Sequence, residues 1–145
     1  MAKSILYMSM SLDRFITGRD DGRGNGLGTG GHRLHAWLGE PVSEPPYFDP
    51  ATGGTTTGCR SSYPRAAPRR SRRATGSTTV MVHGANLAQS LLREGLLDEL
   101  EIHLIPVVLG DGRPLFCVDR VELELTRVLD APGVTHLRYR VRHGA

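Results

Sequence analysis

The sequence predicts an α/β fold in which a mixed β-sheet carries flanking helices. Three stretches support this prediction. Residues 4–16 alternate as a strand does, residues 80–109 have a strand, turn, helix and strand pattern, and residues 121–142 have a hairpin pattern. The chain of 145 residues has the length of one domain that can bury a core. We therefore expect residues 1–145 to form a single domain.

The first strand is predicted from period-two alternation over residues 4–16, SILYMSMSLDRFI. Leu6, Met8 and Met10 fall on one side of the strand, opposite Tyr7 and its odd-numbered neighbours. Asp13 comes at the end of this stretch. By residue type alone, Asp13 suits a turn that terminates the strand.

Residues 80–92 predict a second strand followed by a helix. Val80–Val82 is a β-branched run suited to a buried strand, and Gly84 then turns the chain. Asn86 is expected to N-cap the helix, with Gln89 completing a capping box. One helix face is apolar through Leu87, Ala88, Leu91 and Leu92.

The same block continues with a helix stop and another strand. Gly95 is placed to end the helix in a left-handed conformation. Residues 100–109 are strongly apolar and predict a buried strand, and Gly110-Asp111-Gly112 predicts a turn after it.

A strand that turns through glycine into a helix has a chemical consequence. Free backbone N–H groups and the positive end of the helix dipole then point at one spot, which can hold a phosphate. An ordinary packing unit with a tight turn has the same spacing. The residues alone leave both interpretations open.

Residues 18–31 are glycine-rich and predict a flexible loop. Gly26, Gly28 and Gly31 match a G-x-G-x-x-G spacing, but the preceding strand ends too early, so we treat the match as chance. Residues 32–38 predict a short helix with Leu34, Trp37 and Leu38 facing inward.

Residues 51–79 do not have the composition of a folded segment. They contain no Leu, Ile, Val, Met, Phe or Trp, and Tyr63 is their only aromatic residue. Such a stretch buries too little apolar surface to offset its ordering entropy, which predicts a disordered linker. Its arginines also allow a nucleic-acid-binding arm, although only Tyr63 could stack on a base.

The end of the chain predicts a β-hairpin that turns at Ala131-Pro132-Gly133. Leu137 and Tyr139 are expected to face the core, whereas Arg138 and Arg140 face water or a partner. Glutamates of the first strand are placed to pair with arginines of the second. The histidines at 103, 136 and 143 are interpreted as structural.

Composition narrows the function classes. A net charge of +3 is too small to imply a nucleic-acid partner. No apolar run approaches the roughly 20 residues that span a bilayer. No secretory signal precedes the first strand, so we expect a cytoplasmic protein. Cys59 and Cys117 suggest neither a metal site nor a disulfide framework, and His32 and His35 lack further ligands.

Several pieces of the chain resemble one reductase family. The pieces are Val82-His83-Gly84-Ala85, Leu96-Leu97-Asp98-Glu99-Leu100, Pro106-Val107-Val108-Leu109-Gly110 with Leu115-Phe116, and Ser11-Leu12-Asp13-Arg14-Phe15-Ile16. The family includes the C-terminal domain of the bifunctional riboflavin-biosynthesis deaminase-reductase. In its Ser-Leu-Asp-Gly-Phe-Ile signature, glycine stands where this chain has Arg14. The resemblance covers residues 3–38 and 80–142.

The resemblance implies a dihydrofolate-reductase-like fold. Family members carry further strands and a helix between the two matching blocks, so we expect the sheet to lack central strands. We also hypothesise that residues 51–79 are a shifted reading frame or follow an internal deletion. Residues 18–31 correspond to the mobile loop of such folds, and family members commonly form homodimers.

The resemblance further implies an NADPH-dependent reductase that transfers hydride to a pyrimidine or pterin. The first-choice substrate is 5-amino-6-(5-phosphoribosylamino)uracil, and dihydrofolate is second. Asp13 is the implied catalytic carboxylate, and His83, Gly84, Ala85 and Asn86 are the implied cofactor-binding residues. The alternatives are an inactive, truncated member that serves only as a dimerising fold, and the arginine-rich arm.

Overall fold

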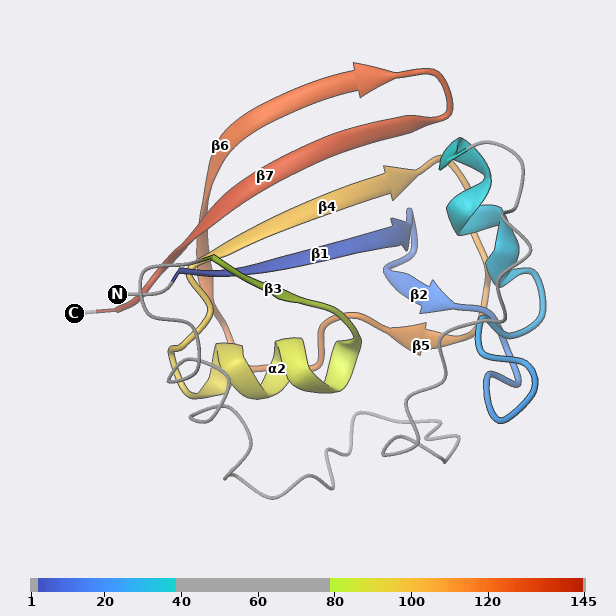
Figure 1. Cartoon of the computed structure of the whole chain (residues 1–145), viewed down its shortest axis with the longest axis horizontal. Helices are drawn as coiled ribbons and strands as arrows, with labels where there is room; N and C mark the ends of the chain where they lie inside the picture. Colours follow the sequence, from blue (N-terminus) through green and yellow to red (C-terminus); the bar gives the residue numbers. More distant parts are fainter. Residues whose placement is uncertain (1–2, 39–78, 145) are drawn as a thin grey trace.

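The computed structural model describes residues 3–38 and 79–144. In chain order, the described elements are strand β1 (Ser4–Ser11), strand β2 (Phe15–Thr17), 3₁₀ helix η1 (Gly31–Leu38), strand β3 (Val80–Val82), helix α2 (Ala85–Arg93), strand β4 (Glu99–Ile105), strand β5 (Arg113–Pro114), strand β6 (Glu122–Ala131) and strand β7 (Val134–Arg142). Figure 1 shows these elements along the chain.

Five strands form one mixed sheet in the order β3-β1-β4-β7-β6. β1 is parallel to both β3 and β4, whereas β7 is antiparallel to β4 and to β6. Ser4 lies opposite Val80 in the β1–β3 register. This pairing confirms that the two separated sequence blocks join in a single sheet (Figure 1). β2 and β5 form a separate two-stranded sheet.

Helix α2 begins and ends at glycines. Gly84 is the N-cap, and no side chain caps the helix. The prediction that Asn86 caps it with Gln89 was therefore wrong. At the other end, Gly95 has φ 63°, its N–H donates to the Leu92 carbonyl, and the N–H of Leu96 donates to the Leu91 carbonyl. These two bonds form a Schellman motif, which confirms the predicted stop at Gly95.

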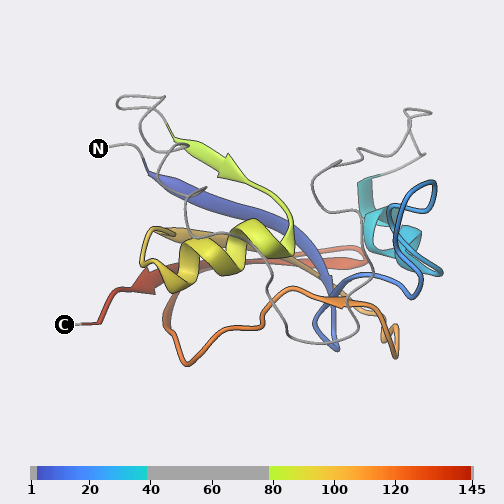
Figure 2. The ribbon, with the colours of Figure 1, turned by 90° about the horizontal axis from the view of Figure 1, so that it is seen from below.

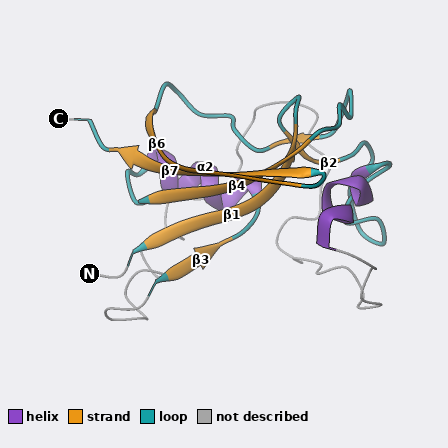
Figure 3. Ribbon diagram, turned by 90° about the horizontal axis from the view of Figure 1, so that it is seen from above, coloured by secondary structure: helices purple, strands orange, loops and turns teal. Residues whose placement is uncertain are grey.

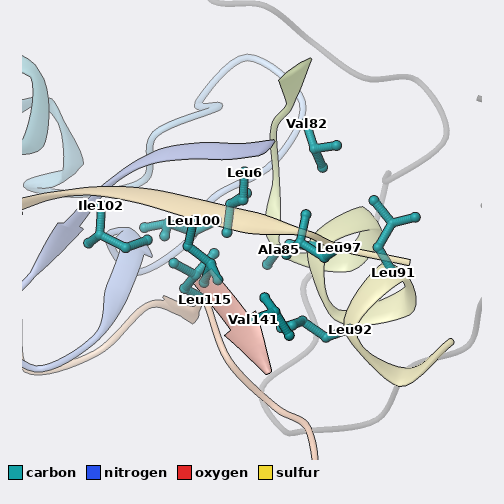
Figure 4. Close-up of a cluster of buried hydrophobic side chains, with 12 residues drawn as sticks. Leu6, Val82, Ala85, Leu91, Leu92, Leu97, Leu100, Ile102, Leu115 and Val141 are labelled. Carbon is teal, nitrogen blue, oxygen red and sulfur yellow. The ribbon is translucent and has the colours of Figure 1, made fainter. Parts of the chain in front are cut away.

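The main core lies between α2 and one face of the sheet. Leu6 of β1, Leu100 of β4 and Leu91 of α2 are almost completely buried there. Figure 4 shows how side chains from the helix and the strands meet in this cluster. Burying each leucine contributes roughly 1.5–3 kcal/mol. Figures 2 and 3 view the molecule from opposite sides and place α2 on one face of the sheet.

A second, smaller core attaches η1 to the ends of the strands. Leu34 of η1 is fully buried against Ile105 and Val134. Trp37 also packs against this cluster, but Leu38 is 63% exposed, so the expectation that Leu38 faces inward was wrong. A 3₁₀ helix turns once every three residues, which separates Leu34 and Leu38 in direction.

Residues 18–31 fold back on themselves in the structure. The N–H of Gly18 donates to the Leu27 carbonyl, and Arg19 bridges to Thr29. A Cβ on Gly28 would lie 2.2 Å from the Gly18 carbonyl oxygen. The glycines in this loop therefore permit close backbone packing, a use that the prediction of a flexible loop did not consider.

The face of the sheet opposite α2 carries buried charges that pair across strands. Arg138 Nη2 of β7 lies 2.7 Å from Glu99 Oε2 of β4, and Lys3 also contacts Glu99. Arg127 of β6 reaches Glu101 at 2.5 Å. Burial raises the pKa of Glu99, but Lys3 and Arg138 outweigh that effect and leave the pKa below its ordinary value.

The β6–β7 hairpin forms one edge of the sheet. Glu124 lies opposite Arg140 and their charged groups are 3.6 Å apart, which confirms the expected pairing of glutamate with arginine. A register shift between Leu125 and Arg127 marks a bulge at Thr126. Four large apolar side chains of β6 are 39–55% exposed: Leu123, Leu125, Val128 and Leu129.

Some expectations fall on other parts of the chain. The atypical segment 51–79, with its linker, reading-frame and arm interpretations, lies almost entirely outside the described residues, as does the interval in which central strands were expected to be missing.

Cys117 is disulfide-bonded, contrary to expectation, because pairing depends on proximity in the fold and not on sequence spacing. Among the described helices, none is long and apolar enough to cross a membrane.

Candidate functional site

The carboxyl ends of parallel strands define the candidate site. β3, β1 and β4 run in the same direction, so the segments after them start from the same edge of the sheet. These segments contain His83-Gly84, Asp13-Arg14 and the turn at Gly110-Asp111-Gly112. In open α/β sheets, ligands bind outside the carboxyl ends of the strands. Figure 1 shows α2 and β2 starting from this edge.

Gly84 forms the turn between β3 and α2. Its φ of 86° and ψ of 148° lie close to a region that is essentially restricted to glycine. Its N–H donates to Met8 Sδ at 3.3 Å, which holds the turn against β1. A Cβ at this position would meet nothing within 4 Å. The backbone therefore faces open space where the helix begins.

The neighbours of Gly84 complete the helix N-terminus. Ala85 is 3% exposed and packs into the main core, whereas Asn86 is partly exposed. The first N–H groups of a helix have no intrahelical acceptor, so those at the start of α2 are available to an anion. His83 is exposed, and its ring lies edge-on to Tyr7 at 6.1 Å.

Asp13 ties the end of β1 to the turn after β4. Its Oδ1 accepts hydrogen bonds from the Ser11 hydroxyl at 2.6 Å and the Leu109 N–H at 3.1 Å, and its Oδ2 accepts from the Gly110 N–H at 2.7 Å. Partial burial raises the pKa of Asp13, but these hydrogen bonds outweigh it and leave the pKa below its ordinary value. Asp13 is therefore a carboxylate at neutral pH.

The register separates Asp13 from the helix N-terminus. Val82 lies opposite Leu6 and Gly84 contacts Met8, whereas Asp13 lies in the turn beyond Ser11, the last residue of β1. From Met8 to Ser11 the strand advances roughly 10 Å, at about 3.3 Å per residue. The two sets of sequence-predicted residues thus share one edge of the sheet but form two separate clusters.

Arg14 adopts a conformation that glycine tolerates best. Its φ is 72°, which is the left-handed region. The N–H of Arg14 donates to the Ser11 carbonyl, and its own carbonyl accepts from Leu115, so the backbone is held in place on both sides. This finding agrees with the glycine at this position in the signature that the chain resembles.

Sequence reasoning missed several residues that build the site. The Ser11 hydroxyl both donates to Asp13 and accepts from the Phe15 N–H at 2.9 Å. Gln89 is buried, and its Nε2 donates to the Leu115 carbonyl at 3.0 Å, which connects α2 to the segment after β5. A polar residue on the apolar face of a helix was the available signal, but it was interpreted as part of a capping box.

The described residues contain no group of three His, Cys, Asp or Glu side chains that could hold a metal ion. At the carboxyl edge, the described residues offer a fixed carboxylate, open backbone N–H groups and a helix dipole. This combination suits an anionic ligand near α2 and a hydrogen-bond donor near Asp13.

Comparisons with known proteins agree with this fold. Residues 71–136 match the model of the RibD C-terminal domain. The uncharacterized protein YwjB of Bacillus subtilis (strain 168) is 32% identical in an alignment 147 residues long. This alignment covers 79% of this chain and 82% of that protein.

Solved structures share the fold at low identity. A protein from Shewanella sp. PV-4 assigned to riboflavin biosynthesis has a TM-score of 0.59 at 19% identity, with 99% of this chain and 100% of that chain covered. The riboflavin biosynthesis reductase Rib7 of Saccharomyces cerevisiae has a TM-score of 0.53 at 16% identity, covering 98% of this chain and 89% of that chain. RibD of Acinetobacter baumannii has a TM-score of 0.54 at 16% identity, covering 98% of this chain and 58% of that chain. This chain has the dihydrofolate-reductase-like fold of these proteins and belongs to the RibD C-terminal domain family.

Proposed function

We propose that this protein is an NADPH-dependent reductase that transfers hydride to a pyrimidine or pterin ring. The first-choice substrate is 5-amino-6-(5-phosphoribosylamino)uracil, because the family match and the fold both point to the riboflavin pathway. The observation that carries the proposal is the open glycine turn at Gly84, where α2 begins at the carboxyl edge of the sheet. The substrate itself stays a prediction, as does the cytoplasmic location.

The residues at the start of α2 fit a dinucleotide's pyrophosphate. Gly84 leaves the approach to the helix N-terminus open, since a Cβ there would meet no neighbour within 4 Å. The backbone N–H groups of Ala85 and Asn86 would donate to phosphate oxygens, and the helix dipole would favour the negative charge. His83 is exposed beside this turn and would add a donor from its ring.

Asp13 is the proposed carboxylate of the substrate side. NADPH, when bound, would supply the hydride, and the chain's own residues would orient the substrate and exclude water. The lowered pKa of Asp13 suits a hydrogen-bond acceptor for a ring N–H better than a proton donor near neutral pH. Its ties to Leu109 and Gly110 hold the carboxylate in one orientation.

The sharpest test is NADPH titration of wild type and of Asn86→Asp, followed by nicotinamide fluorescence. The new charge at a helix N-terminus should preserve or slightly raise stability, by about 0.3–1 kcal/mol. The same charge should repel the pyrophosphate and weaken NADPH binding on the order of tenfold, or about 1.4 kcal/mol. Ser90→Asp, one turn along the same helix, is the matched control and should bind as wild type does.

An inactive family member is the alternative function. An inactive member would have the same fold without the binding site. Under this alternative, wild type is folded by circular dichroism but shows no saturable NADPH binding. Equal binding by wild type and Asn86→Asp would instead contradict the assignment of the pyrophosphate to α2. The arginine-rich arm lies in the segment outside the described residues and gains no support from the site.

The proposed partner is a second copy of the chain, paired through the outer edge of β6. An antiparallel two-fold arrangement would place Glu124 opposite Arg127 and Leu123 opposite Val128, on matching faces of the two strands. The axis would then pass beside the bulge at Thr126, which leaves both halves of the strand regular. The exposed leucines and valine of β6 support this pairing, since long apolar edges favour association.

Light scattering after size exclusion tests the dimer. Wild type should have about twice the chain mass of 15.8 kDa. Leu125→Lys, at a side chain that is 52% exposed, should be monomeric and still folded. Leu38→Lys is the matched control, because Leu38 is 63% exposed on η1, and it should remain a dimer. A monomeric wild type would exclude the pairing.

A further inference from the structure

Two histidines on adjacent strands, one buried and one half-buried, form a pair on the sheet face opposite α2. His103 of β4 lies directly opposite His136 of β7, and their Nδ1 atoms are 2.6 Å apart. His103 is 2% exposed, and its Nε2 has no hydrogen-bond partner. The pair lies outside the carboxyl-edge clusters and takes no part in the proposed reduction.

Aromatic rings enclose the pair. The Tyr7 ring centroid is 4.2 Å from that of His103, and the Trp37 ring lies 4.8 Å from His103 and 5.1 Å from His136. Trp37 comes from η1, and its Nε1 donates to the Ser9 hydroxyl at 3.2 Å. The histidine pair therefore forms part of the surface on which η1 rests.

The short contact between nitrogens allows only one proton in it. One Nδ1 must donate and the other accept, so at least one ring of the pair carries no proton on Nδ1. If both rings were imidazolium ions, two N–H groups and two positive charges would face each other at this distance. That state cannot keep the observed geometry, so the rings would have to separate.

We propose that the His103–His136 pair is an acid-sensitive latch that holds η1 on the sheet and releases it when both rings become protonated. The hydrogen bond between the rings and the contacts of Trp37 with both of them form the closed state. Separation of the rings opens it.

The groups that face the pair favour the closed state near neutral pH. Burial, and after it the charge of the neighbouring His136, lowers the pKa of His103 to about 4, although Glu101 acts in the opposite direction. Glu101 is already paired with Arg127 and Arg138, which limits its effect. From the other elements, Tyr7 of β1 and Trp37 of η1 face His103 without charge.

Release of η1 would affect the candidate site, because both contact the second, smaller core. Leu109 packs in the same cluster as Leu34 of η1 and Trp37, and the Leu109 N–H is one of the three donors to Asp13. Displacement of η1 would loosen the segment after β4 and so the orientation of the Asp13 carboxylate. Through the latch, the pH would control the orientation of the Asp13 carboxylate at the carboxyl edge of the sheet.

Trp37 is the single tryptophan of the chain, so its fluorescence reports directly on the latch. In a titration of the full chain from pH 7.5 to 3, we expect the Trp37 emission to be quenched and shifted to the red. The midpoint should lie near the His103 pKa of about 4. Far-UV circular dichroism should change only at lower pH. Fluorescence and circular dichroism that change together in wild type would overturn the latch.

Two variants and one control give a second readout. Because the proposed release needs two imidazolium rings, His136→Gln and His103→Gln should each abolish the separate fluorescence transition. His32→Gln, at an exposed histidine of the same 3₁₀ helix, should leave the midpoint unchanged. A separate transition that persists in His136→Gln would overturn the latch even if His103→Gln failed to fold.

Discussion

Arg14→Gly is the substitution that most directly tests the backbone geometry at the end of β1. Arg14 has φ 72°, a left-handed conformation that costs an L-residue roughly 1–2 kcal/mol. Its side chain is exposed. Its backbone is fixed by hydrogen bonds to Ser11 and Leu115, so the chain cannot relax the angle without breaking the turn.

The expected gain is the relief of strain minus the entropy that glycine loses on folding. Glycine costs roughly 0.5–1 kcal/mol more than other residues in backbone entropy, so the net stabilisation should be about 0.5–1 kcal/mol. For a domain of this size, that gain corresponds to a rise in Tm of about 2–4 °C. The same geometry predicts that Arg14→Ala gains nothing, because alanine keeps the Cβ and therefore the strain.

Thermal unfolding and urea titration, each followed by circular dichroism, measure the effect. Arg23→Gly is the matched control, because Arg23 is also exposed but does not have a positive φ, and it should be neutral or slightly destabilising. If Arg14→Gly and Arg14→Ala gave the same Tm as wild type, or if Arg23→Gly gained as much, the strain argument would be refuted.

Three further changes test other parts of the fold. Asp13→Ala should lower the free energy of unfolding by about 1–2 kcal/mol, because it removes hydrogen bonds to a charged but partly exposed group. Urea titration at pH 7 measures this loss. A loss near zero would contradict the stabilising connection between the end of β1 and the turn after β4. Gly95→Ala should lower the free energy of unfolding by about 1 kcal/mol, because the φ of Gly95 is 63°. Gly22→Ala is the control in the same assay, because Gly22 does not have a positive φ, and an equal loss of stability in both variants would contradict the prediction. Because the pKa of Glu99 is lowered in the folded state, its stabilisation should be full above the ordinary glutamate pKa and decline as pH falls below it; Glu99→Gln should flatten that part of a pH–Tm curve, and an unchanged slope would count against the charge network.

The sequence predicted the glycines at the two ends of α2 better than the side-chain contacts of the candidate site. Gly84 and Gly95 were placed correctly at the two ends of α2, because a positive φ is a local requirement that residue type reveals. The capping role of Asn86 was wrong, since Gly84 is the N-cap and the helix starts two residues earlier than a cap at Asn86 requires. Gln89 instead turns inward to the Leu115 carbonyl, a partner 26 residues away.

Asp13 shows why the site itself could not be derived from local pattern. The strand ending there was predictable from period two, but two of the donors that hold its carboxylate come from Leu109 and Gly110, at sequence separations of 96 and 97. The register between β1 and β3 likewise decided that Asp13 and Gly84 lie along one edge but apart.

By itself, the sequence determined the elements of this protein: the alternating strands, the amphipathic helix and the glycine turns that end them, because periodicity and allowed backbone angles are local properties. It also determined, through resemblance, which family the chain belongs to. Only the tertiary structure decided which polar groups meet, such as Glu99 with Arg138 and His103 with His136. The reason is physical: strand register brings together residues far apart in the chain, and register is set by the packing of the whole sheet against α2.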